Sequence, residues 1–155
     1  MAKALVLYHS QEHGNTALMA EAVAQGIRES DCEVDLFNTN NGRFDVTLFP
    51  QYDGAAFGSP DYYSYVAGTL KTFMDDHYIA EVHKGVKGLR DKPYVLFCSH
   101  GGGGKVRTVM INLFTRIGTL VGTPVDCMSK PDRKTLEKCF ELGKQLAQVI
   151  KKNDS

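Results

Sequence analysis

The chain has 155 residues, of which 43% are hydrophobic and 23% are charged, as in ordinary globular proteins and unlike disordered or fibrous chains. Lys plus Arg and Asp plus Glu both number 18, so the formal net charge is zero. This balance does not provide the clustered positive charge that nucleic acids or anionic membrane surfaces attract. We therefore expect one domain over residues 1–155 that binds neither.

Neither the apolar runs nor the cysteines suggest export. The N-terminal apolar run, 4–8, is too short for a signal peptide, and no run approaches the ~20 apolar residues of a membrane span. No Cys-x-x-Cys pair occurs, which argues against a zinc site or a thioredoxin-like motif. We expect a cytoplasmic protein with reduced thiols and no bound metal.

Continuous apolar runs alternate with amphipathic stretches along the chain. In chain order we predict a strand at 4–8, a helix over 15–29, strands at 34–37 and 54–59, a helix from 66 to about 77, a strand at 94–99, a helix over 106–120, a weaker strand at 124–128 and a helix over 136–150. Residues 38–53 form a turn followed by an irregular stretch or a short helix.

Strands that read as unbroken apolar runs and are separated by helices are typical of a parallel sheet covered on both faces. Five such units predict an α/β, flavodoxin-like doubly wound sheet of strand order 2-1-3-4-5 with helices on both faces. Ligands bind such sheets beyond the carboxyl ends of the strands, near the point where the strand order reverses. The loops after the first, third and fourth strands are therefore the candidate site.

The first of these loops joins a strand to the start of a helix. Its residues are Ser10, Gln11, Glu12, His13, Gly14, Asn15 and Thr16. Short hydroxyl and amide side chains with a glycine suit inward-facing backbone N–H groups, and the helix N-terminus adds partial positive charge, so the loop suits a phosphate monoester. The same residues are also explained by an ordinary helix N-cap at Asn15 or Thr16.

The second loop is rich in tyrosine. It contains Ser59, Pro60, Asp61, Tyr62, Tyr63, Ser64 and Tyr65. Aromatic rings at the mouth of a sheet offer a stacking surface to a planar ligand, although they also serve simply to cover the helix beneath them.

The third loop is rich in glycine. It contains Ser99, His100, Gly101, Gly102, Gly103 and Gly104, followed by Lys105. Glycines let the backbone approach a ligand closely and direct N–H groups at it, whereas the alternative is a flexible connection without a ligand. Together the three loops suit a phosphorylated planar ring.

Two of these loops carry a family resemblance. The stretch 8–16 resembles the phosphate loop of flavodoxin-like flavoproteins. The stretch 58–63, with Gly68, Leu70, Lys71, Phe73 and Asp75 downstream, resembles the flavin loop of the multimeric flavodoxin and NAD(P)H:quinone oxidoreductase branch. Iron–sulfur flavoproteins share that branch, but their compact cysteine cluster is absent from this sequence.

The resemblance implies non-covalent FMN. Its phosphate would lie on Ser10, Gln11, His13, Gly14, Asn15 and Thr16, and the segment 60–65 would cover one side of the flavin ring. Ser99 to Gly104 would meet the other side and present N–H groups to the pyrimidine edge. Glu12 departs from this pattern, because a carboxylate beside a phosphate is unfavourable unless it points to solvent.

Two redox functions follow from the resemblance, and no side chain is expected to act as an acid or base because the flavin carries the chemistry. The first is an electron carrier between protein partners. The second is an NAD(P)H-dependent quinone or flavin reductase that passes electrons to a small acceptor. Related proteins of the branch self-associate, which makes a homo-oligomer a further expectation.

A minor alternative is a thiol phosphatase. Residues Cys127 and Arg133 fit a Cys-x5-Arg loop between a strand and a helix. Such a loop needs a low-pKa thiolate and successive inward N–H groups, and Pro131 removes one of these donors while Asp132 adds repulsion.

Overall fold

The central strands of this protein are buried on both faces of the sheet. In the computed structural model, which describes residues 1–154, Leu5 and Leu7 of the first strand lie in one apolar cluster, whereas Ala4 and Val6 lie in a second. All four are fully buried. Because successive side chains of a strand point to opposite faces, such a strand needs a helical layer on each side.

The strands form one parallel sheet in the order β2-β1-β3-β4-β5, as predicted, and β6 also pairs with β4. The helices and strands are β1 (Lys3–Tyr8), α1 (Asn15–Arg28), β2 (Glu33–Asn38), β3 (Gly54–Pro60), α2 (Gly68–Tyr78), β4 (Lys92–His100), α3 (Val106–Leu113), β5 (Gly118–Leu120), β6 (Val125–Met128) and α4 (Arg133–Asp154). Short 3-10 helices cover Thr39–Asn41, Val46–Gln51 and Phe114–Ile117, and a π-helical turn covers Ile79–His83.

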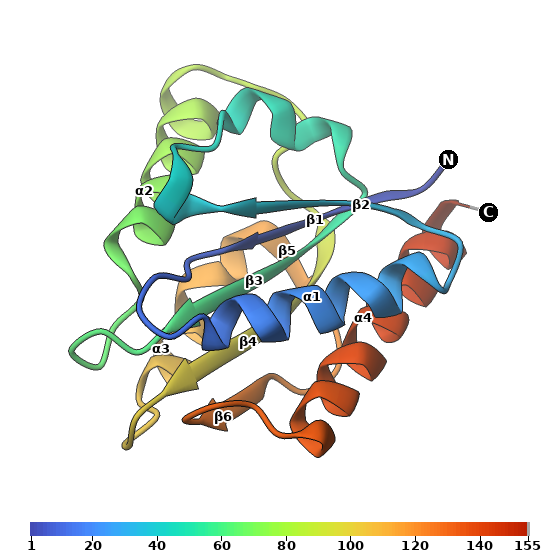
Figure 1. The fold of residues 1–155 in the computed structure, drawn as a ribbon. Coiled ribbons are helices and arrows are strands. Elements are labelled where there is room, and N and C mark those ends of the chain that lie inside the picture. Colours follow the sequence, from blue (N-terminus) through green and yellow to red (C-terminus); the bar gives the residue numbers. More distant parts are fainter. Residues whose placement is uncertain (155) are drawn as a thin grey trace.

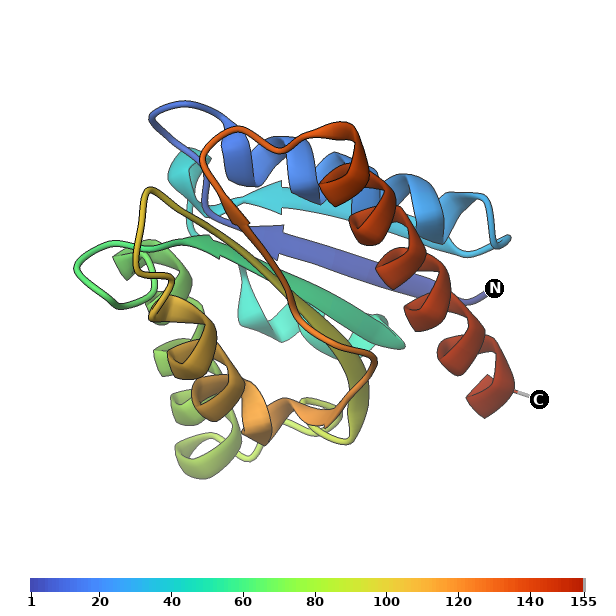
Figure 2. The same cartoon turned by 90° about the horizontal axis from the view of Figure 1, so that it is seen from below.

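The helices divide between the two faces of the sheet. Residues of α1 and α4 share a cluster with β1, β3 and β4, and those of α2 and α3 share the other cluster with the opposite side of the same strands. Figure 1 shows α1 and α4 in front of the sheet, and Figure 2 shows the sheet between the two helical layers. The prediction of helices on both faces is confirmed.

The edge of the sheet beyond β4 differs from the prediction. The expected helix over 106–120 ends at Leu113, and Gly118–Leu120 instead pairs with the start of β4 as β5. Strand β6 pairs with the end of β4, at Phe97–His100. Gly118 has φ 151°, and a Cβ there would lie 2.2 Å from the Lys92 carbonyl oxygen. This glycine lets the chain leave its helical turn and join the sheet, so the prediction of a helix up to residue 120 is wrong.

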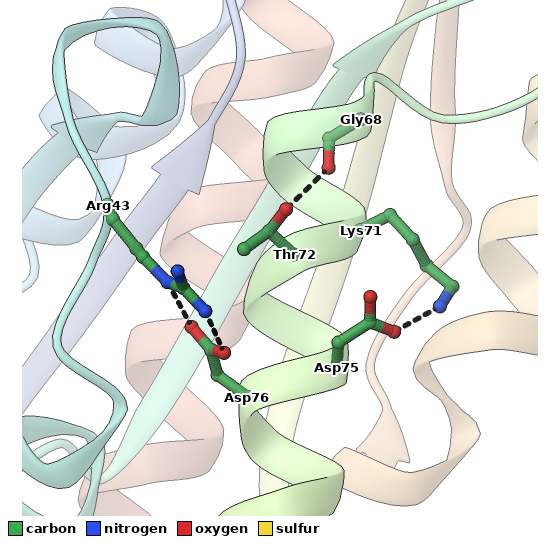
Figure 3. A network of polar contacts seen from close by, with 6 residues as sticks. All are labelled: Arg43, Gly68, Lys71, Thr72, Asp75 and Asp76. Atoms are coloured by element: carbon green, nitrogen blue, oxygen red, sulfur yellow. Dashed lines mark hydrogen bonds and ion pairs between the residues drawn. The ribbon is translucent and has the colours of Figure 1, made fainter.

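Helix α2, which follows the tyrosine-rich loop, is held at its far end by an ion pair. The guanidinium of Arg43 donates from Nε and Nη2 to the two carboxylate oxygens of Asp76, at 2.9 and 2.6 Å. Figure 3 shows this fork on one side of α2 and the Lys71–Asp75 pair on the other. Planar two-bond pairs of this kind add geometric specificity, so the segment after β2 fixes the position of α2.

Glycines allow α1 and α4 to approach closely. A Cβ at Gly26 would lie 2.0 Å from the Phe140 carbonyl oxygen, and one at Gly143 would lie 2.0 Å from the Val23 carbonyl oxygen. Both distances lie far inside van der Waals contact, so each glycine makes room for the backbone of the other helix.

Replacing Gly143 with alanine is expected to lower the free energy of unfolding by roughly 2–3 kcal/mol, because the methyl group forces the two backbones apart. Urea denaturation measures this change. Gly68→Ala is the matched control, since a Cβ at Gly68, in the first turn of α2, meets nothing within 4 Å. Equal stability of the two variants would contradict this interpretation of the α1–α4 contact.

Candidate functional site

The carboxyl ends of the strands enclose a cavity of about 640 Å³. Its lining comes from the loops after β1, β3, β4 and β6, in the part of the sheet where the strand order reverses. The lining residues are Ser10, Gln11, Glu12, His13, Gly14, Asn15, Thr16, Pro60, Asp61, Tyr62, Ser99, His100, Gly101, Ser129 and Lys130. The three loops that the sequence singled out therefore meet in one place.

The start of α1 forms one end of the cavity. Gly14 precedes the helix with φ 72°, and the first turn contains no acidic residue. The Ser10 hydroxyl oxygen accepts a hydrogen bond from the Ala17 N–H at 3.2 Å, which leaves its own proton available to a ligand. Glu12 is exposed, so its carboxylate has access to water. This end of the cavity suits an anion.

The Asn38 side chain, at the end of β2, fixes where this loop begins. Its Oδ1 accepts from the Ser10 N–H at 3.0 Å, and its Nδ2 donates to the Ser10 carbonyl oxygen at 3.0 Å. The backbone of Ser10 is therefore fully occupied, and only its hydroxyl group faces a ligand. Sequence analysis missed Asn38, because nothing in the spacing of the chain connects it with Ser10.

Two hydroxyl groups connect the first and third loops. Thr16 Oγ1 lies 2.8 Å from Ser99 Oγ, and both side chains are buried at the cavity. A hydroxyl pair shares one hydrogen bond and retains one proton, which a ligand oxygen can accept. The end of β4 thus contributes to the anion end of the cavity as well as to its wall.

The tyrosine-rich loop is a tight hairpin. Tyr62 and Tyr65 exchange two backbone hydrogen bonds of 3.0 and 3.1 Å, and Tyr63 and Ser64 between them have φ 55° and 64°. Two central residues with positive φ correspond to a type I′ turn, which most often uses Asn and Gly. Of the three tyrosines only Tyr62 lines the cavity, whereas Tyr63 is fully exposed at the tip and Tyr65 is largely exposed.

Asp61 ties the second loop to the third. Its backbone N–H donates to the Ser99 carbonyl oxygen at 2.8 Å. Its carboxylate accepts from the Ser64 N–H at 2.6 Å and from the Val106 N–H, at the start of α3, at 3.1 Å. Each carboxylate oxygen thus accepts one hydrogen bond from the protein, so the side chain positions two loops while it also lines the cavity.

A buried histidine supports the Tyr62 ring from behind. His9 Nδ1 lies 2.7 Å from Thr69 Oγ1, and its ring packs edge-on against Tyr62 with 5.6 Å between ring centroids. Burial is the main cause that lowers the pKa of His9, and this lowered pKa keeps the ring mainly neutral at pH 7. The side chain therefore supports Tyr62 without adding charge to the cavity.

Other predicted site residues lie outside the cavity lining. Ser59 is fully buried, and its hydroxyl oxygen accepts from the Ala67 N–H at 3.0 Å, so it stabilises the turn into α2. Gly101 lines the cavity, but the glycines from Gly102 to Gly104 do not. Gly104 has φ 67° and packs beside the His100 ring, so that glycine serves the loop's own geometry.

The loop after β6 contributes two residues that sequence analysis missed, Ser129 and Lys130. The Ser129 N–H donates to the His100 carbonyl oxygen at 2.8 Å, which holds this loop against the end of β4. The feature of the sequence that could have identified them is their position directly after the predicted strand at 124–128, which pairs with the fourth strand. The predicted strand order places that strand at the edge of the sheet, and the predicted site does not include its loop.

The geometry around Cys127 does not support a thiol phosphatase. Burial is the main cause that raises the pKa of Cys127, and its thiol donates to the Ser129 carbonyl oxygen at 3.6 Å. Arg133 lies on the exposed surface of α4 and pairs with Glu137 at 3.2 Å. A protonated thiol and an arginine directed to another partner do not form an anion-activated nucleophile.

The cavity fits a planar ring that carries a phosphate. At one end, the free hydroxyl protons of Ser10 and Thr16 or Ser99 lie with the N-terminus of α1. Further along, Tyr62 and Gly101 bound the space with an aromatic ring and with exposed backbone. A doubly wound sheet with such a site defines the class of proteins that bind phosphorylated ring cofactors at their carboxyl edge.

Comparison with known proteins identifies the family. The model of the Flavodoxin family matches residues 6–143, and the chain therefore belongs to this family. It is 29% identical to "Probable flavodoxin 2" of Bacillus subtilis (strain 168), over 95% of each chain. It is 26% identical to "NAD(P)H dehydrogenase (quinone)" of Archaeoglobus fulgidus, over 98% of this chain and 99% of the other.

A solved structure agrees with the sequence matches. A flavodoxin from the domain Archaea superimposes with a TM-score of 0.81 at 27% identity, over 96% of this chain and 99% of that one. Members of the family bind FMN non-covalently, and the chain is an FMN-binding electron-transfer flavoprotein. Within residues 1–154, no helix is both long enough and apolar enough to span a membrane.

Proposed function

We propose that this chain is a one-domain electron carrier whose FMN occupies the cavity beyond β1, β3 and β4. The loop 10–16 holds the phosphate, with the hydroxyl groups of Ser10 and Thr16 as donors. Tyr62 covers one side of the ring, and the backbone from Ser99 to Gly101 meets the other. When bound, FMN supplies the redox chemistry, and the protein's residues bind and orient it.

The observation that carries this proposal is the arrangement of the cavity lining. Hydroxyl groups and the N-terminus of α1 gather at one end, and an aromatic ring and glycine backbone lie next to them. A volume of about 640 Å³ falls within the range of small-ligand sites. The anion end suits the phosphate of FMN, and the aromatic and glycine surface next to it suits the flavin ring.

A reductase that uses NAD(P)H is the second candidate. It is favoured by the similarity to a protein named NAD(P)H dehydrogenase (quinone) and by the balanced charge of 18 acidic and 18 basic residues. Carriers that find basic partners through long-range attraction benefit from excess acidic charge, which this chain lacks. The carrier is preferred because the Flavodoxin family model and relatives named flavodoxin match nearly the whole chain.

The experiment begins with the purified chain and added FMN, followed by visible absorbance and by quenching of flavin fluorescence. We expect a yellow complex that dithionite bleaches rapidly and NADPH bleaches slowly, with or without a quinone. Fast bleaching by NADPH, followed by reoxidation with the quinone, would replace the carrier by the reductase. A chain that acquires no flavin absorbance would contradict both functions.

A further inference from the structure

A single lysine stands out among the charged residues that line the cavity. Of the residues that line the cavity, Lys130 is the one with a permanent positive charge. It follows Ser129, whose φ of 62° and hydrogen bond to the His100 carbonyl oxygen fix the direction in which the chain leaves β6. Figure 2 shows this segment as the connection between β6 and α4.

Two acidic groups near Lys130 have other partners. The Asp61 carboxylate accepts from the Ser64 and Val106 N–H groups. The Asp132 carboxylate accepts from the Thr135 N–H at 2.8 Å and so caps the first turn of α4. Neither carboxylate is bonded to Lys130, whose side chain is exposed and can extend toward the cavity.

We propose that the Lys130 ammonium group contacts the phosphate of bound FMN and contributes to its affinity. This inference rests on the proposed placement of the phosphate on the loop 10–16. A phosphate monoester carries a charge of about −1.5 to −2 at pH 7, and the hydroxyl and backbone donors around it are neutral. A mobile ammonium group at the rim adds a charge-assisted hydrogen bond and offsets the exposed carboxylate of Glu12 on the same cavity.

The test compares FMN with riboflavin, which has the same ring and no phosphate. Dissociation constants of both are measured by flavin fluorescence for the unchanged protein and for Lys130→Gln, at low and at high ionic strength. We expect Lys130→Gln to weaken FMN binding by on the order of tenfold at low salt and by less at high salt, because salt screens the attraction. Riboflavin binding should not change.

Lys134→Gln is the matched control, since Lys134 is an exposed lysine of α4 that lines a different groove. It should change neither constant. Equal FMN affinity of Lys130→Gln and the unchanged protein would overturn the inference, as would an equal loss of FMN and riboflavin affinity. Failure of the unchanged protein to bind FMN would overturn the proposed function itself, and the inference with it.

Discussion

Replacing Asp61 with alanine is expected to weaken FMN binding by on the order of 100-fold. The substitution removes the acceptor of the Ser64 N–H group in the second loop and of the Val106 N–H group, which begins α3 just after the third loop. Hydrogen bonds to a charged group contribute about 1.5–3 kcal/mol each, and without them the loops lose their common position. Titration with FMN, followed by fluorescence quenching, measures the loss.

Two further variants separate positioning from other effects of Asp61. Asp61→Asn keeps one acceptor oxygen, so we expect an intermediate loss of about tenfold. Asp45→Ala is the control, because Asp45 accepts from the Thr47 N–H at 3.0 Å in the same manner but does not line the cavity. A gain in affinity for Asp61→Ala would mean that the carboxylate acts mainly by repelling the cofactor, which contradicts a positioning role.

Replacing Ser10 and Thr16 together with alanine is expected to weaken FMN binding by at least 100-fold. The Ser10 hydroxyl retains a proton for a ligand, and the Thr16–Ser99 hydroxyl pair retains another. A charge-assisted hydrogen bond to phosphate contributes about 1.5–3 kcal/mol. Riboflavin should lose far less affinity, because it lacks the group these hydroxyls bind. Parallel titrations with the two flavins give the comparison.

The control for this pair is Cys32→Ala. Cys32 is buried just before β2, at the opposite edge of the sheet from the cavity, and burial raises its pKa to about 11. Its replacement should leave FMN affinity unchanged. Urea denaturation of all variants shows whether loss of the Ser10 cap on α1 lowers stability by about 1 kcal/mol without unfolding the chain. Comparable FMN affinities of the double variant and Cys32→Ala would contradict the assignment of the phosphate loop.

Much of the fold could be predicted because its central strands leave a simple signal. The runs at 4–8, 54–59 and 94–99 are apolar without interruption, and strands of that kind lie inside parallel sheets. The edge of the sheet was less predictable. Apolar residues from Ile117 to Leu120 continue a helical spacing, and only the contact of Gly118 with Lys92 places them in a strand.

The sequence predicts which loops form the site, but not what the individual residues of these loops do. The rule that ligands bind where parallel strands end identified the loops at 10–16, 59–65 and 99–104. Asp61 is predicted from the sequence as a cofactor contact and does line the cavity, but the hydrogen bonds of its carboxylate to Ser64 and Val106 could not be predicted. Lys130 comes from a loop far along the chain, and its position depends on how β6 pairs with β4. Such relations arise only from tertiary structure.

The close contact of α1 with α4 has a consequence for synthesis on the ribosome. Val23 and Ile27 of α1 are fully buried in a cluster that includes Leu146 and Ile150 of α4. A nascent chain that ends before Arg133 therefore exposes the inner face of its first helix and lacks the cover that locks this helix to the sheet. The loop that precedes α1 is complete early in translation, yet the helix that it begins is covered by α4 only after the last helix has emerged.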